Sequence, residues 1–156
     1  RAFGWFLLRI PVISGLVKKI NSARTTRTLS SLLSSGVSFV YSIEIVIDVV
    51  QNPYYKEVLR EAREKVEVGQ PISKVFEKHE NLYPIFVSEM MIVGEETGEL
   101  GPMLFKVAEF YEEEVDQQTK NMSTIVEPVL MLIVGAVVGF FAISMISPMY
   151  SLVDTI

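Results

Sequence analysis

The feature that most constrains the fold is a run of 26 residues, from Pro128 to Val153, that carries no charged side chain. As a helix this run measures about 39 Å, at about 1.5 Å per residue, against a bilayer hydrocarbon core of about 30 Å. It is therefore long enough to cross a membrane with some tilt. Its place at the C-terminal end excludes a signal peptide. The alternative is a hairpin buried inside a soluble protein. It is disfavoured because the rest of so short a chain is too small to cover both sides of such a segment.

Charge divides the chain into three zones. Six basic residues and no acidic residue precede Glu44, whereas 17 acidic and seven basic residues lie between Glu44 and Asp116. We expect a basic membrane-proximal lead over residues 1–22, a helical bundle over 23–122, and a transmembrane helix with a short tail over 123–156.

The charge asymmetry also predicts an orientation. Because basic residues favour the cytoplasmic side of a membrane, we expect the bundle in the cytoplasm and the C-terminus on the outer side. The charged residues shortly before the apolar run are acidic apart from Lys120. The basic lead, which is far from the run in sequence, could therefore flank another membrane segment instead. Within the lead, Phe3–Leu8 is typical of a membrane-surface segment with an aromatic anchor, or of an ordinary packed helix.

Apolar residues in the middle zone recur at helical spacing. The pattern predicts helices over 29–50, 54–68 and 72–78, one from Tyr83 that is interrupted at 94–98, and a long one from Met103, bent or continuous at Pro128. No segment alternates for long enough to need a sheet. The predicted fold is all-α: an antiparallel bundle of about six helices followed by one C-terminal transmembrane helix.

The composition excludes several classes of function. The absence of cysteine and the presence of a single histidine, His79, remove disulfide scaffolds, thiolate metal sites and multi-histidine metal sites. The net charge of −5 argues against nucleic acid as a partner. Since His79 lies at a polar helix end without a matching nucleophile, we expect no enzyme activity, no cofactor and no metal.

The segment from Gly94 to Gly101 superficially resembles a phosphate-binding loop. It lacks a terminal Gly-Lys-Ser/Thr, and its three glutamates would repel phosphate. A helix–helix corner is the simpler interpretation, and recognition of a partner by the glutamates is the alternative.

Further along, Glu109, Glu112, Glu113 and Asp116 share one helix face, which suits solvent or a protein partner; calcium or magnesium would need additional oxygen ligands from elsewhere. The candidate partner-contact residues are Gly94, Glu95, Glu96, Gly98, Leu100, Glu112 and Glu113.

Two features mark the apolar run itself. Gly135 and Gly139 form a GxxxG pattern, which permits close packing of a second helix. Glu127 and Pro128 stand where the chain is expected to meet the membrane, with the carboxylate at headgroup depth or paired if it lies deeper.

Several stretches, in this order and spacing, resemble the type II secretion system F family. They are Leu8–Gly15, Ala23–Val37, Val66–Ser73, Tyr83-Pro84, Val93–Leu100, Val107–Val115, Glu127-Pro128 and Ser147–Tyr150. Gly101-Pro102 departs from the polar or acidic residues expected there, although proline suits the first turn of a helix.

The resemblance implies an inner-membrane platform protein with two copies of this helical domain and about three spans. The chain resembles the second copy and the final span. The implied partners are a hexameric assembly ATPase, pilin or pseudopilin subunits, other inner-membrane assembly proteins, the lipid bilayer and further copies of the protein. The family offers no catalytic residues to carry over.

Two other classes of protein remain open from the residues alone. One is a membrane-anchored helical adaptor unrelated to filament assembly. The other is a transporter or channel subunit, which the run disfavours because Ser144 and Ser147 are its main polar side chains before Tyr150.

Overall fold

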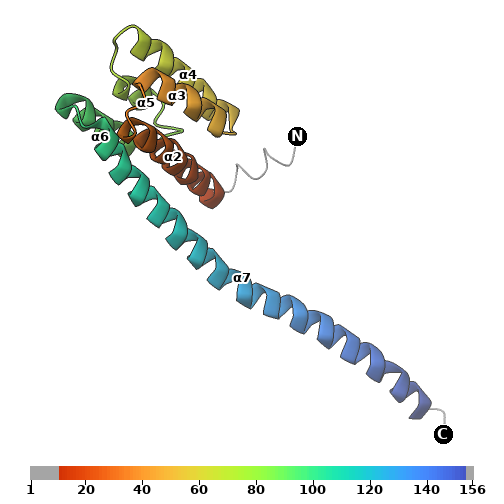
Figure 1. Ribbon diagram of the computed structural model, residues 1–156. Helices are drawn as coiled ribbons and strands as arrows, with labels where there is room; N and C mark the ends of the chain where they lie inside the picture. The colour runs from red at the N-terminus through yellow and green to blue at the C-terminus, as the bar shows by residue number, and fades with distance from the viewer. Residues whose placement is uncertain (1–10, 154–156) are drawn as a thin grey trace. The chain divides into compact units, whose positions relative to one another are not determined.

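A computed structural model describes residues 11–153, without the side chains of residues 11–13, 125 and 147–153. The predicted lead segment Phe3–Leu8 therefore lies outside the described residues. The described part is helical and contains no strand. Its helices are α2 (Pro11–Ser34), α3 (Phe39–Val49), α4 (Pro53–Glu67), α5 (Ser73–Lys78), α6 (Ile85–Thr97) and α7 (Leu100–Val153), coloured in chain order in Figure 1. The predicted all-α class is confirmed.

The chain divides into two compact units, one ending at Asp116 and the other formed by Gln117–Ile156. The first unit is the bundle, made of α2 to α6 and the beginning of α7. The second is the remainder of α7, which continues as helix through Pro128. Residues 11–22, which the charge pattern assigns to the lead, belong to α2.

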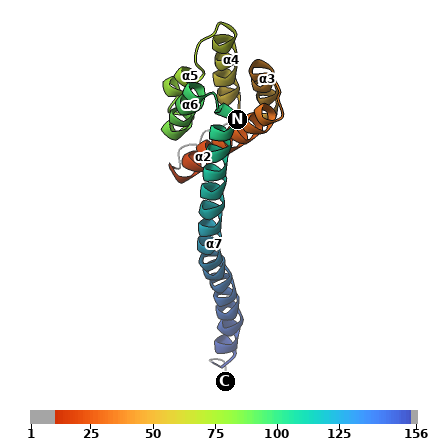
Figure 2. The same cartoon turned by 60° about the vertical axis from the view of Figure 1, so that its left-hand side comes forward.

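Neighbouring helices pair within the bundle. Figure 2 shows α3 beside α4 and α5 beside α6. In addition, α2 contacts α3, and α4 contacts α5. The end of α2 meets the beginning of α7, where the Ser30 hydroxyl donates a hydrogen bond of 2.9 Å to the carbonyl oxygen of Gly101. These contacts enclose a single apolar core.

Tyr83 occupies the centre of that core and is fully buried. Its ring lies 4.6 Å from the ring of Phe76 and 5.1 Å from that of Tyr55, measured between centroids. Its hydroxyl lies 3.0 Å from the Thr25 hydroxyl of α2, so the buried oxygen has a partner. Burial raises the pKa of Tyr83 well above its usual range, so the ring stays neutral and joins α2 to the helices around it.

The buried face of α2 is built from small polar side chains as well as leucine. Ser22, Thr25, Thr26 and Ser30 are all buried. The Ser22 hydroxyl donates to the Lys18 carbonyl and the Thr26 hydroxyl to the Ser22 carbonyl, each at 2.8 Å. The other two hydroxyls bond to neighbouring elements, Thr25 to Tyr83 and Ser30 to Gly101. Because every one of these buried hydroxyls has a partner, α2 can pack closely on its neighbours without a polar penalty.

Two helix boundaries show how the sequence sets the turns. At the start of α4 the Asn52 side chain accepts a 3.0 Å hydrogen bond from the Tyr54 amide, and Pro53 fills the first helical position. At the end of α6, Gly98 adopts the left-handed conformation (φ 73°) that terminates a helix. The predicted interruption at 94–98 is wrong at its beginning, because α6 continues to Thr97 and the chain breaks only at Gly98 and Glu99.

Candidate functional site

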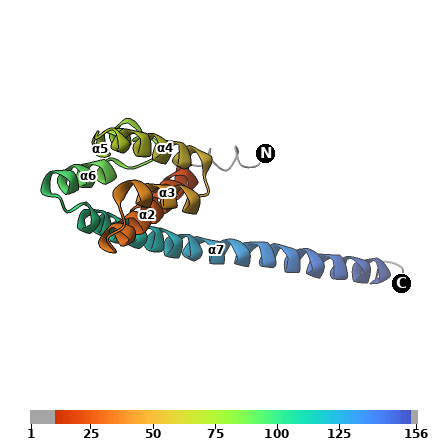
Figure 3. The same cartoon turned by 45° about the horizontal axis from the view of Figure 1, so that its top comes forward.

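The corner between α6 and α7 is built on a very close backbone approach. A Cβ atom placed on Gly94 would lie 2.8 Å from the Leu100 Cα and 2.9 Å from its Cδ1. Only glycine fits there without displacing the start of α7, since the nearest atom belongs to backbone. Figure 3 shows α6 running into this corner ahead of α7. Pro102 lies in the first turn of α7, where a missing N–H costs nothing.

The two adjacent glutamates of the corner have different environments. Glu95 accepts hydrogen bonds of 2.5 Å from the Ile72 amide and from the Ser73 hydroxyl, so its carboxylate caps the beginning of α5. Glu96 is exposed. Both glutamates were candidates for contact with a partner protein. The oxygens of Glu95 already have partners within the bundle, so Glu96 is the better candidate of the two.

Acidic residues of α7 bind basic residues of α2. The Arg27 guanidinium donates to both oxygens of Glu112, at 2.8 and 2.6 Å, and also lies 4.6 Å from the centroid of the Phe105 ring. Lys19 Nζ lies 2.7 Å from a Glu114 oxygen. Glu113 is exposed on the same stretch of helix. The basic α2 residues thus hold α2 antiparallel to α7, and Glu112 is engaged rather than free for a partner.

Another ionic cluster joins α4 to the end of α5. Glu61 lies 2.8 Å from Lys78 Nζ through one oxygen and 2.8 Å from His79 Nε2 through the other. The hydrogen bond from Lys78, followed by that from His79, holds the pKa of Glu61 below its usual range. The single histidine therefore has a structural partner. Among the described residues, no group of three or more histidine or acidic side chains is arranged to hold a metal ion.

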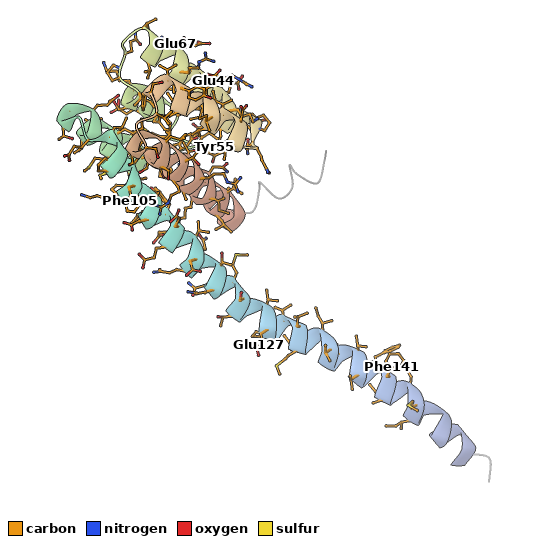
Figure 4. The ribbon with its side chains drawn as sticks, viewed as in Figure 1. Glu44, Tyr55, Glu67, Phe105, Glu127 and Phe141 are labelled. Atoms are coloured by element: carbon orange, nitrogen blue, oxygen red, sulfur yellow. The ribbon has the colours of Figure 1, made fainter. Side chains whose placement is uncertain are left out.

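The second unit presents apolar side chains to its surroundings on every side. The described large apolar residues from Met122 to Ile146 are exposed. A Cβ atom added to Gly135 or Gly139 would meet nothing within 4 Å apart from its chain neighbours and the backbone of the same helix. Glu127 and Phe141 are labelled along this helix in Figure 4, and Glu127 and Pro128 are both exposed. The alternative of a buried hairpin is wrong, because α7 continues as one helix.

Of the described helices, α7 alone is long and apolar enough to cross a membrane; its most apolar stretch has a mean hydropathy of 2.7, and none of it is buried. A small helical bundle together with such a helix defines the class: a membrane protein with a helical domain. The family model for type II secretion system protein F matches residues 25–148. The chain belongs to this family.

Curated relatives agree with this assignment. The chain is 37% identical to the type IV pilus assembly protein PilC of Thermus thermophilus, over 96% of the chain and 37% of the relative. It is 35% identical to the PilC of Myxococcus xanthus, over 96% of the chain and 36% of the relative. It is 34% identical to the type II secretion system protein F of Xanthomonas campestris, over 97% of the chain and 37% of the relative.

The chain thus spans little more than a third of the length of these relatives. Family membership and the apolar α7 together indicate an inner-membrane protein. Sequence reasoning found the corner and the acidic face of α7, but missed the α2 partners of that face and the capping role of Glu95. The spacing of Glu95 from Ser73 gives no local signal of their contact.

Proposed function

We propose that this chain forms part of a non-enzymatic inner-membrane platform on which type IV pilin or type II secretion pseudopilin subunits are assembled. The observation that carries the proposal is the alignment of nearly the whole chain, bundle and apolar helix together, with pilus assembly and secretion proteins. A small helical bundle joined in sequence to an apolar helix suits a part that binds partners and transmits force.

The bundle faces the cytoplasm and the C-terminus lies on the outer side. The basic residues of the N-terminal zone support this orientation. The chain contains no cysteine, so a single introduced thiol reports its own position. In a whole protein freed of other cysteines, a membrane-impermeant maleimide added to intact spheroplasts labels Thr155→Cys and leaves the exposed Ser31→Cys unlabelled until the membrane is opened. The reverse pattern would contradict the orientation.

The partners are a hexameric assembly ATPase on the cytoplasmic side, pilin or pseudopilin subunits in the membrane, other inner-membrane assembly proteins and further copies of the platform. Glu96 and Glu113 are exposed charges through which a cytoplasmic partner can engage the bundle. Gly135 and Gly139 leave the surface of α7 low enough for a second membrane helix to pack closely.

The experiment removes the gene and restores it, as wild type or with Glu96→Lys, in the organism that carries it. Deletion is expected to abolish surface filaments or secretion, and the wild-type gene to restore them. Glu96→Lys is expected to reduce assembly at an unchanged protein level. A matched control is Glu64→Lys, an equally simple charge reversal at an exposed position of α4. Normal filaments and secretion in the deletion strain would contradict the platform role and favour a membrane-anchored adaptor.

A further inference from the structure

Helix α2 is attached to the bundle in two different ways along its length. Its end is held by apolar packing, because Leu29 is fully buried and both Leu32 and Leu33 pack against the core. We call the preceding part, from Ser14 to Arg27, the α2 arm. Its buried side chains are Asn21, Ser22, Ala23, Thr25 and Thr26. Only one of these is apolar, and the apolar side chains at positions 16, 17 and 20 remain partly exposed. The arm therefore adds little apolar burial to the bundle.

Several buried polar groups of the arm are bonded along their own helix. The side-chain amide of Asn21 donates to the Val17 carbonyl oxygen at 2.8 Å. The Ser22 hydroxyl donates to the Lys18 carbonyl oxygen, and the Thr26 hydroxyl to the carbonyl oxygen of Ser22, at the same distance. Because these bonds remain intact when the arm leaves the bundle, its separation leaves none of the three groups without a partner.

Polar contacts join the arm to the helices beneath it. The Thr25 hydroxyl lies 3.0 Å from that of Tyr83, and Lys18 Nζ donates to the carbonyl oxygen of Glu80. The Tyr83 ring packs on two other aromatic rings of the core, neither of which belongs to α2. Departure of the arm therefore removes the partner of the Tyr83 hydroxyl and leaves the packing of its ring in place.

Ion pairs join the arm to α7. Lys19 Nζ lies 2.7 Å from a Glu114 oxygen, and the Arg27 guanidinium donates to both oxygens of Glu112. These four side chains are between 29% and 46% exposed. Water and dissolved ions therefore reach the pairs, and added salt weakens them by screening.

We propose that the α2 arm opens from the bundle as a unit, by release of its ion pairs with α7, while the leucines from Leu29 onward keep the end of α2 in place. Segments with little apolar burial are the ones that open locally without global unfolding. The open state uncovers the Tyr83 hydroxyl and frees the carboxylates of Glu112 and Glu114. Glu112, which the sequence assigns to partner contact, is thus available to a partner only when the arm is open. The inference concerns the bundle and does not depend on the platform role.

The test is amide hydrogen exchange of the whole protein in a mild detergent, followed by mass spectrometry. Without its tertiary contacts the arm is a short helix, which is only marginally stable in water. We therefore expect its amides to exchange at least about tenfold faster than those of the core segment Val58–Ala62. Raising the salt concentration from about 0.05 M to 0.5 M should speed exchange of the arm about threefold and leave the core segment unchanged. Equal exchange rates in the two segments would overturn the inference.

Charge removal tests the role of the ion pairs. Lys19→Gln combined with Arg27→Gln is expected to speed exchange of the arm about tenfold and to abolish its response to salt. The matched control is Arg63→Gln with Lys78→Gln, which removes the same number of positive charges from partly exposed ion pairs of α4 and α5. This control should leave exchange of the arm unchanged.

A chemical crosslink supplies the converse test, since the chain contains no cysteine. In a whole protein freed of other cysteines, Lys19→Cys and Glu114→Cys are joined by a short reagent with two thiol-reactive ends that a reductant can cleave. The crosslink is expected to slow exchange of the arm to the rate of the core segment, and cleavage to restore the fast rate. Exchange of the crosslinked arm as fast as that of the cleaved one would overturn the inference. So would a charge-removal variant that speeds exchange throughout the bundle, because opening would then be global.

Discussion

Replacing Gly94 by alanine tests the close packing of the α6–α7 corner. The added methyl group would lie 2.8 Å from the Leu100 Cα, a backbone atom that no side-chain rotation can move away. Either helix α6 or the start of α7 must therefore shift. By contrast, a Cβ atom on Gly101 would meet its nearest neighbours, the Leu33 Cβ and the Ser34 Oγ, at an ordinary 3.5 Å.

The magnitude follows from two opposing terms. Inserting a methyl group into a well-packed site costs about 1–3 kcal/mol, and the fixed backbone contact favours the upper part of that range. Replacing glycine by alanine within a helix returns about 0.5–1 kcal/mol. The net expectation for Gly94→Ala is a loss of about 1–2 kcal/mol in the free energy of unfolding. Gly101→Ala, which meets no close contact, is expected to leave stability unchanged or slightly raise it.

The assay is thermal unfolding of the whole chain in a mild detergent, followed by circular dichroism. For a domain of about 100 residues, each 1 kcal/mol lowers the midpoint by roughly 4–8 °C. The two variants make the same chemical change, so their difference isolates the contact with Leu100. A Gly94→Ala protein as stable as the Gly101→Ala protein would refute the packing argument.

Three further perturbations have defined outcomes. Glu95→Gln weakens the cap of α5 and is expected to lower the free energy of unfolding by about 1–2 kcal/mol, with faster amide hydrogen exchange at Ile72. The same change at exposed Glu96 should lower it by less than about 0.5 kcal/mol, and equal losses would contradict the capping role. Because the Glu61 pKa is lowered in the folded bundle, its contribution to stability is present above the ordinary value of 4.5 and disappears as the pH falls through the lowered one. Glu61→Gln should therefore lower the urea midpoint at neutral pH and reduce its fall in acid, and an unaltered acid response would count against the cluster. Gly139→Leu should weaken filament assembly while the protein still inserts in the membrane, and normal filaments would exclude helix packing there.

The sequence predicts most helices of the fold, but the single helix expected over 29–50 is wrong: α2 ends at Ser34 and α3 begins at Phe39, with Gly36 in the left-handed conformation between them. Asn52-Pro53 marks the start of α4 because both its cap and its first residue are local signals. The uncharged run from Pro128 identifies the part of α7 that is apolar enough to cross a membrane. The beginning of α2 escapes this reasoning. Its buried face includes Ser22, Thr25 and Thr26, whose hydroxyls bond within the bundle, so the usual apolar period is hidden.

The corner shows where sequence reasoning stops. The sequence does not distinguish the roles of Gly94 and Gly98. Glycine is required at 98 by the positive φ angle of 73°, and at 94 by the close approach of the Leu100 backbone. The carboxylate of Glu95 is equally ambiguous, since its partner Ser73 lies 22 residues away. Such contacts depend on how helices meet, and only the folded arrangement supplies that information.

Purification of the tagged whole protein from crosslinked native membranes tests most directly whether the chain serves as an assembly platform. Partners are identified by mass spectrometry. We expect recovery of an assembly ATPase together with pilin-like subunits, and the identity of those subunits would distinguish a pilus from a secretion machine. Recovery of neither, with a different stable membrane complex in their place, would contradict the platform role.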